Sequence, residues 1–209
     1  MKLIDLGRCD YKRAWALQKE IVKKRIGGKE EDTLVVVEHD HVITLGRKTS
    51  IYNTKEQPIP VYSVERGGDA TYHGPGQIVF YPIMYLKDRD VRKFVYMLEE
   101  TIINSVEKFG IKAGRLEGHR GVWYNGKKLA SIGLAVENWV TYHGFALNVN
   151  TDLSYFNLIR PCGLEPEQIT SMEKILGRAL PIEDVKSNLL NSFSKVFNVR
   201  LEVAHFVKD

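Results

Sequence analysis

The sequence predicts an α+β fold (in the wider α/β class), a mixed or mostly antiparallel sheet with helices packed on it. Segments with strand character outnumber those with helical character, and one strand, Thr33–Glu38, is apolar and β-branched almost throughout. The dipeptide Asn125-Gly126 between two apolar runs is the favoured two-residue turn of a tight hairpin. With 209 residues, of which 44% are hydrophobic, the chain can bury one sizeable core. We therefore expect a single domain over residues 1–209.

Three segments have apolar residues at helical spacing. The first follows Asp10, an N-cap candidate, and ends at Gly27-Gly28, where glycine permits a left-handed stop. Its inward face is expected at Ala14, Leu17, Ile21 and Ile26. The other two helices are expected at about 90–109, closed by Gly110, and from Pro181 to about Phe197.

The remaining periodic segments are expected to be strands. Thr33–Glu38 should lie in the centre of the sheet, because both of its faces are apolar. A loop is expected at 53–60, with its two prolines. The other expected strands are one at the N-terminus, 77–81, the hairpin 121–124 with 127–136, its antiparallel neighbour 140–149, and 200–206.

Charge and composition exclude several classes of protein. Thirty Lys and Arg against 26 Asp and Glu give a net charge of +4, which suits a mixed solvated surface or an acidic protein partner. The basic residues are scattered, so we do not expect nucleic-acid binding. No run of about 18 apolar residues exists, and no signal peptide is apparent, so we expect no membrane span and a cytoplasmic protein. Two cysteines, Cys9 and Cys162, are too few for a disulfide framework and are expected as thiols.

The densest chemical signal is Arg66-Gly-Gly-Asp-Ala-Thr-Tyr-His-Gly-Pro-Gly-Gln77. With four glycines in 12 residues, it is not expected to be an ordinary strand or helix. Glycine lets the backbone adopt positive φ and approach a ligand closely. A wide surface turn is the alternative, but such a turn rarely combines Arg, His, Tyr and Gln. We therefore favour a ligand-contacting loop, and the spacing of a phosphate-binding P-loop is absent.

Two further segments carry reactive side chains. Lys128 follows the Asn125-Gly126 turn and precedes the small residues Ala130, Ser131 and Gly133, which leave room either for a ligand or for a packed helix. Cys162 stands between Pro161 and Gly163, and a cysteine in such a turn is more accessible than one inside a strand or helix. Its reactivity requires a nearby cation, which sequence spacing cannot identify. Cys9 has no comparable setting and is interpreted as structural.

The histidines do not predict a metal site. His39 and His41 would lie on one face of a strand, but no carboxylate or cysteine cluster completes a ligand set. His143, which opens the strand with Gly144, is more typical of a hydrogen-bonded residue than of a ligand.

Together these segments resemble the lipoyl(octanoyl) transferase family, also called lipoate–protein ligase B. The family pattern is similar to Arg-Gly-Gly-x-x-Thr-aromatic-His-x-x-Gly-Gln-x-x-x-Tyr. It is matched by Arg66, Gly67, Gly68, Thr71, Tyr72, His73, Gly76, Gln77 and Tyr81. The segments 35–39, 44–47, 119–123, 128–133, 143–144 and 161–163 also fit, so the resemblance covers nearly the whole chain. It departs at His41-Val42 and around Glu137, outside the proposed chemistry.

The resemblance implies a biotin/lipoate ligase-like fold, with a larger mixed sheet, a smaller sheet and helices. It implies transfer of an octanoyl or lipoyl group from octanoyl-acyl carrier protein to a lysine of lipoyl domains. The acceptors would be 2-oxoacid dehydrogenases and the glycine cleavage H protein. Cys162 would carry the acyl group as a thioester, and a monomer, without metal, ATP or other cofactor, would suffice.

Lys128 would stabilise the Cys162 thiolate as a cation, or would take a proton when neutral. By the same resemblance, a set of residues from three segments would line the acyl tunnel and supply oxyanion donors. These are Arg66, Gly67, Gly68, Asp69, Ala70, Thr71, Tyr72, His73, Ser131, Ile132, Gly133, His143, Gly144, Phe145 and Ala146. We expect His73 to position groups and not to transfer protons.

Two rival functions remain open. An ATP-dependent lipoate or biotin protein ligase of the same fold would share the glycine-rich segment and the lysine, but it needs no nucleophilic cysteine. A non-catalytic basic binding module would cluster its Lys and Arg on one face with stacking aromatic residues, which the scattered charges do not favour.

Overall fold

The computed structural model describes residues 1–49, 58–159 and 166–204. Within them lie short 3₁₀ helices as well as α-helices and strands. In chain order the elements are β1 (Lys2–Cys9), α1 (Tyr11–Ile26), β2 (Thr33–His39), β3 (Val42–Leu45), β4 (Val61–Ser63), β5 (Ala70–His73), β6 (Gln77–Ile83), α2 (Val91–Glu107), β7 (Gly114–Leu116), β8 (His119–Tyr124), β9 (Lys127–Glu137), β10 (Val140–Asn148), η2 (Leu153–Leu158), η4 (Pro166–Gln168), α3 (Met172–Leu176), α4 (Ile182–Phe197) and β11 (Glu202–Val203).

The main sheet has eight strands in the order β11-β1-β2-β6-β10-β9-β8-β7. Strand β1 pairs in parallel with both β2 and β11, and the other pairs are antiparallel. The predicted mixed sheet is therefore confirmed. Strand β2 lies between β1 and β6, as its apolar sequence predicts, because each of its faces is covered.

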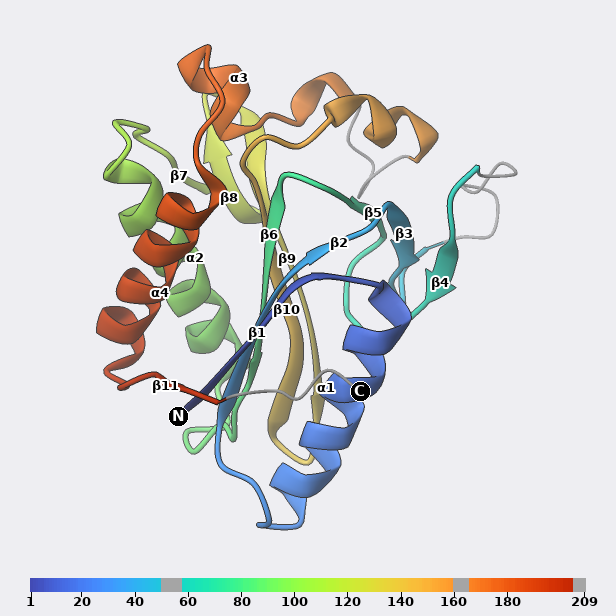
Figure 1. Cartoon of the computed structure of the whole chain (residues 1–209), viewed down its shortest axis with the longest axis vertical. Helices are drawn as coiled ribbons and strands as arrows, with labels where there is room; N and C mark the ends of the chain where they lie inside the picture. Colours follow the sequence, from blue (N-terminus) through green and yellow to red (C-terminus); the bar gives the residue numbers. More distant parts are fainter. Residues whose placement is uncertain (50–57, 160–165, 205–209) are drawn as a thin grey trace.

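Helices cover both faces of this sheet, with α2 and α4 on one side and α1 on the other (Figure 1). The α2–α4 layer buries Phe94, Leu98, Ile102 and Phe193 against the sheet. Each such side chain contributes roughly 1.5–3 kcal/mol by leaving water. Helix α1 is capped by Asp10, whose Oδ1 accepts from the Arg13 N–H at 3.1 Å, as predicted.

Two tight turns shape the strands that carry the site. Asn125 and Gly126 have φ of +47° and +75°, which confirms the predicted type I′ hairpin between β8 and β9. Asn138 and Trp139, with φ of +46° and +65°, connect β9 to β10 in the same way. The Trp139 carbonyl accepts from the Leu86 N–H at 2.8 Å, which holds this strained turn against the end of β6.

A second sheet of three strands, β4-β3-β5, packs beside the first. Its strand β5 lies inside the glycine-rich segment 66–77, which was expected not to contain a strand. That expectation is wrong for 70–73, because Ala70–His73 pair residue by residue with Val42–Leu45 of β3. The partner strand, distant in sequence, supplies the hydrogen bonds that local composition does not predict.

Smaller differences from the sequence expectations occur at segment ends. The last strand covers only Glu202–Val203, and residues 205–206 of the expected strand lie outside the described residues. Residues 53–57 of the expected loop also lie outside them. Ile26, expected inward, is exposed because α1 ends there, beyond the sheet. His39 and His41 do not share a strand face, because β2 ends at His39 and the chain bends before His41.

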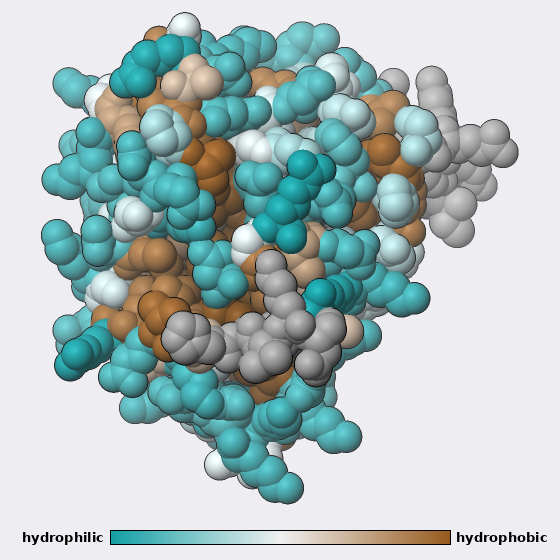
Figure 2. All heavy atoms as spheres, in the orientation of Figure 1, coloured by the Kyte–Doolittle hydropathy of each residue, from teal (hydrophilic) through white to brown (hydrophobic). Residues whose placement is uncertain are grey.

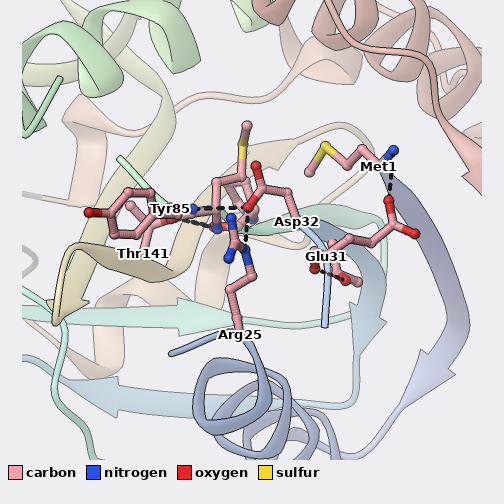
Figure 3. Close-up of polar contacts among 9 residues, drawn as sticks. Met1, Arg25, Glu31, Asp32, Tyr85 and Thr141 are labelled. Carbon is pink, nitrogen blue, oxygen red and sulfur yellow. Dashed lines mark hydrogen bonds and ion pairs between the residues drawn. The ribbon is translucent and has the colours of Figure 1, made fainter. Parts of the chain in front are cut away.

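The end of the molecule near the N-terminus is closed by polar contacts (Figure 3). Asp32 Oδ1 accepts from Arg25 Nε at 2.7 Å and from the Tyr85 N–H at 3.0 Å. One carboxylate thereby joins the last turn of α1, the start of β2 and the segment that follows β6. Beside it, the N-terminal ammonium of Met1 lies 3.2 Å from Glu31 Oε2.

The surface is mixed in character. The face in Figure 2 is hydrophilic over most of its area, with hydrophobic residues showing between the polar ones. Among the described residues, no helix is long and apolar enough to cross a membrane.

Candidate active site

The face of the main sheet that carries α1 also carries a cavity, beside the first turn of that helix. Its floor comes from three neighbouring strands, which contribute Ser131 and Gly133, Gly144 and Ala146, and Val79 and Tyr81. Each pair is spaced i, i+2, so both members face the same side of the sheet. Ser131 lies opposite Ala146, and Gly133 opposite Gly144. Small residues thus stand where a sheet normally carries large ones, and they leave a trough.

The cavity itself has a volume of about 50 Å³, and the atom-free space in and around it, which includes open solvent, is about 590 Å³. Gly67, Gly68 and Thr71 are partly exposed and mark the mouth, whereas Tyr11, Tyr81 and other lining residues are buried. The site is therefore a pocket with an open, glycine-rich end and a closed, aromatic end.

Arg66 holds the glycine-rich segment in place from inside. Its guanidinium donates to the carbonyls of Asp69 at 2.7 Å and Thr44 at 2.6 Å, and to Thr44 Oγ1 at 2.9 Å. The Gly67 N–H in turn donates to the Leu134 carbonyl at 2.8 Å, against β9. Gly133 makes this approach possible, because a Cβ there would lie 3.0 Å from Arg66 Cδ. Arg66 therefore positions backbone groups around the mouth.

His73 is a neutral imidazole in the wall of the cavity. Its Nδ1–H donates to Gln77 Oε1 at 2.7 Å, and its Nε2 faces the Thr44 hydroxyl at 3.4 Å. Burial lowers the pKa of His73 to about 3, with smaller contributions from the nearby His39, Arg66 and His143. At neutral pH this residue is a hydrogen-bonding group and not a charge.

His143 reaches the cavity from an unusual backbone conformation, with φ of +54°. Its N–H donates to Gln18 Oε1 at 2.9 Å, and its Nε2 lies 3.3 Å from Glu65 Oε2. Burial lowers the pKa of His143 despite that carboxylate. The hydrogen bond from His143, above other causes, lowers the pKa of Glu65 to about 2. Both shifts fit a neutral imidazole whose Nε2–H donates to an ionised carboxylate.

Aromatic residues close the buried end. Tyr81 donates its hydroxyl to His39 Nε2 at 2.8 Å, because His39 Nδ1–H donates to the Cys9 carbonyl at 3.0 Å. Burial lowers the pKa of His39 to about 4. Tyr11, the first residue of α1, stacks against His73 with ring centroids 6.1 Å apart. The closed end is therefore formed by neutral phenol and imidazole rings, and the Arg66 guanidinium is the cation beside them.

Lys128 lines the cavity at the start of β9 and is only 8% exposed. Its Nζ lies 5.2 Å from the centroid of the Trp123 ring on the paired strand β8, a favourable place for a cation. Its carbonyl accepts from the Thr170 N–H at 3.0 Å, and Ile169 forms a β-bridge with it. Lys128 is thus held through its backbone by Ile169 and Thr170, and its amine lies over the Trp123 ring.

The structure brings nearly all of the sequence-predicted site residues together. Lys128 and the predicted residues of segments 66–71, 131–133 and 143–146 line the cavity, as does His73. Tyr72 does not: its side chain is buried on the opposite side of β5, where its hydroxyl meets His41 Nδ1 at 2.8 Å. Cys162 lies outside the described residues. The roles of all these residues in binding and catalysis stay predictions.

Sequence reasoning missed three lining residues, Tyr11, Val79 and Tyr81. Tyr81 ends the glycine-rich pattern, and this could have identified it. In the sequence, Val79 indicates only a buried strand residue, and Tyr11 indicates only a residue in the first turn of a helix. Among the described residues, no group of three or more His, Cys, Asp or Glu side chains could hold a metal ion.

Residues 10–194 match the model of the lipoyl protein ligase A/B catalytic domain. The chain belongs to this family. A protein of Pyrobaculum calidifontis named "Probable octanoyltransferase" is 47% identical, across 96% of this chain and 87% of that protein. An octanoyltransferase of Caldicellulosiruptor bescii is 44% identical, across 95% of this chain and 92% of its own length.

Solved structures share the fold at low identity. A lipoate-protein ligase A bound with ATP superposes with a TM-score of 0.82 at 18% identity, covering 98% of this chain and 89% of that one. A biotin protein ligase from Aquifex aeolicus gives 0.55 at 13% identity, covering 95% and 69%. The predicted biotin/lipoate ligase-like fold, with its larger and smaller sheets, is confirmed.

Proposed function

We propose that this chain is an octanoyltransferase. It moves an octanoyl or lipoyl group from acyl carrier protein to a specific lysine of lipoyl domains, in 2-oxoacid dehydrogenases and the glycine cleavage H protein. The observation that carries the proposal is a lysine, Lys128, beside a small-residue trough, in a member of this family whose relatives bear the octanoyltransferase name. Residues 1–209 act as one catalytic domain, as a cytoplasmic monomer.

The trough suits an acyl chain. Val79, Gly144 and Ala146 offer it an apolar floor, and each methylene that leaves water contributes about 0.8 kcal/mol. The thioester end of the substrate would lie near Lys128 and the partly exposed glycines, where backbone N–H groups can stabilise an oxyanion. The net charge of +4 favours encounter with an acidic carrier.

The reaction has two acyl transfers. The Cys162 thiolate attacks the thioester carbonyl, the carrier's C–S bond breaks, and the departing carrier sulfur takes the proton held by Lys128. The acceptor amine then attacks the enzyme thioester. Its proton passes to Lys128, the C–S bond to Cys162 breaks, and the thiolate–ammonium pair is restored. Support for Cys162 comes from its position between Pro161 and Gly163 in the sequence. Further support comes from Ile169, seven residues later, which forms a β-bridge with Lys128 and so brings this part of the chain to the lysine.

An ATP-dependent ligase is the second candidate, because a solved structure that shares the fold is a lipoate-protein ligase A with ATP bound. Such an enzyme would activate free octanoate or lipoate as an adenylate and would need no cysteine. The two candidates therefore differ in their requirement for ATP and in the effect of removing Cys162.

The test is to incubate the protein with octanoyl-acyl carrier protein, without ATP, and to measure the intact mass. Wild type and Cys9→Ala should gain one octanoyl group, and Cys162→Ala should not. Addition of an apo lipoyl domain should discharge the adduct and octanoylate the domain. Modification of that domain only with free octanoate and ATP, and without an enzyme adduct, would establish the ligase instead.

A further inference from the structure

A continuous line of buried hydrogen bonds connects His73 with the strand that carries Lys128. His73 Nδ1–H donates to Gln77 Oε1 at 2.7 Å, and Gln77 Nε2 donates to Asn148 Oδ1 at 2.9 Å. Asn148 Nδ2 then donates to the Thr170 carbonyl at 3.0 Å. The Thr170 N–H completes the line by donating to the Lys128 carbonyl at 3.0 Å.

The Thr170 carbonyl fixes which group donates and which accepts in each of these side-chain hydrogen bonds. The Thr170 carbonyl can only accept, so Asn148 must present its amide nitrogen there and its oxygen to Gln77. Gln77 must then present its oxygen to His73, and its nitrogen also donates to the Tyr72 carbonyl at 3.3 Å. His73 is thereby held as the Nδ1–H tautomer. Gln77 and Asn148 are 2% and 4% exposed, so water cannot replace these partners.

We propose that Asn148 is a positioning residue, which keeps the His73 wall of the cavity and the Lys128 wall in a fixed relation without lining the cavity itself. Thr170 is hydrogen-bonded to both Asn148 and Lys128. Loss of the Asn148 amide therefore loosens the contact between Thr170 and the start of β9. Displacement of a reacting group by ~1 Å can lower a rate about 10²-fold. The catalytic part of this inference rests on the proposed octanoyl transfer.

Asn150 offers a matched control. It lies two residues after Asn148, the last residue of β10, and its side chain too both donates and accepts, through Leu180 O at 2.7 Å and Leu180 N at 3.0 Å. Its partners lie on the approach to α4 and not on the line to Lys128. Asn148→Ala and Asn150→Ala should therefore be compared at equal extents of folding, monitored by urea unfolding.

We expect Asn148→Ala to lower kcat for octanoyl transfer at least tenfold with little change in KM for the carrier, and Asn150→Ala to stay within twofold of wild type. Asn148→Asp should recover kcat as the pH is lowered, because a neutral carboxyl group can donate to Thr170 as the amide does. Equal kcat losses at the two positions, or a loss in Asn148→Asp that is independent of pH, would overturn the positioning role.

Imidazole ¹⁵N NMR tests the line without any enzymatic assay. Wild type and Asn150→Ala should show His73 as the Nδ1–H tautomer. In Asn148→Ala only the longer bond to the Tyr72 carbonyl, at 3.3 Å, still holds the Gln77 amide, so part of the population should turn and show His73 as Nε2–H. An unchanged tautomer in Asn148→Ala would overturn the inference. Absence of octanoyl transfer in wild type, with the NMR change present, would instead count against the proposed function alone.

Discussion

At the scale of single residues, the cavity combines the buried side chains of Lys128 and Arg66 with imidazoles, in its wall or directly behind it, that are neutral at physiological pH. His39, His73 and His143 all have a lowered pKa, chiefly because they are buried. A neutral imidazole can position other groups by hydrogen bonding without adding charge near an acyl chain. This leaves Lys128 as the lining residue best placed for proton transfer in the proposed mechanism.

The first prediction concerns Lys128. Lys128→Met keeps the length of the stem and its packing on Trp123 but removes the amine. Octanoyl transfer should fall at least 100-fold, since positioned acid–base groups contribute ~10²–10⁴-fold, while thermal stability should be kept. The matched control is Lys127→Met, one residue earlier on β9 and exposed. Similar transfer rates in the two variants would remove Lys128 from the chemistry.

A second prediction follows from His39. Its folded pKa of about 4 lies below the unfolded value of ~6.5, so in this window the unfolded chain binds more protons. Stability should therefore decrease as the pH falls from about 6.5 toward 4, with His39 contributing up to ~1.4 kcal/mol per pH unit. Urea unfolding of His39→Gln should show a shallower slope, whereas exposed His119→Gln should keep it. The same slope in both variants would contradict this prediction.

At the scale of elements, the mouth of the cavity depends on how closely the Arg66–Gly67 segment approaches β9. A Cβ at Gly133 would lie 3.0 Å from Arg66 Cδ and 3.1 Å from the Gly67 carbonyl. At Gly114 on β7, by contrast, an added Cβ would meet nothing within 4 Å. The two glycines therefore separate the effect of this contact from the general effect of a methyl group on a strand.

The third prediction uses this pair. Gly133→Ala should displace the glycine-rich segment and lower octanoyl transfer by about tenfold, with a stability loss of ~1–3 kcal/mol typical of overpacking. Gly114→Ala should leave both quantities near wild type. Transfer rates under single-turnover conditions and urea unfolding measure the two effects. A Gly133→Ala enzyme as active as Gly114→Ala would mean that the segment adapts without functional loss.

Elements with strong local signals could be predicted from the sequence. Asp10 as a helix cap, Asn125-Gly126 as a turn and Thr33–Glu38 as a central strand each follow from a few adjacent residues. Strands β3, β4 and β5 could not be predicted from the residues, because they are short and their hydrogen bonds come from distant segments. The smaller sheet was expected only through the family resemblance.

The same distinction holds for the site. Its glycine-rich segment and Lys128 were predicted because their composition is unusual for a surface turn or a strand. Tyr11 was not, since a tyrosine in a first helical turn carries no sign that α1 begins beside β5. Asn148 was missed for a similar reason: its importance depends on Gln77 and Thr170, which only the folded sheet places around it.

At the scale of the whole molecule, Asp32 joins separate segments at the end shown in Figure 3. This partly buried carboxylate joins Arg25 to the Tyr85 N–H, so it links α1 to the segment that follows β6. The cavity residues lie along other parts of the sheet. Changes here should therefore alter stability and leave transfer intact.

The fourth prediction is that Asp32→Ala lowers the free energy of unfolding by about 1–3 kcal/mol, the usual range for hydrogen bonds to a charged group, without changing octanoyl transfer per folded molecule. Glu20→Gln, which breaks only the exposed pair with Lys24, should have a smaller effect. Urea unfolding and a transfer assay on the same samples provide the measurement. A loss of transfer beyond the unfolded fraction would show coupling between this end and the cavity.

The residues that form the cavity are far apart in the sequence, and this determines when the cavity can form during synthesis. Its wall begins at Tyr11, its floor needs β10 paired with β6, and the Ile169 and Thr170 contacts to Lys128 come from a still later segment. Ribosomes release a chain from its N-terminus at about 5–20 residues per second, so these parts appear many seconds apart. A chain that ends before β10 therefore lacks part of the cavity floor and the Ile169 and Thr170 contacts to Lys128, so the cavity is completed only late in synthesis.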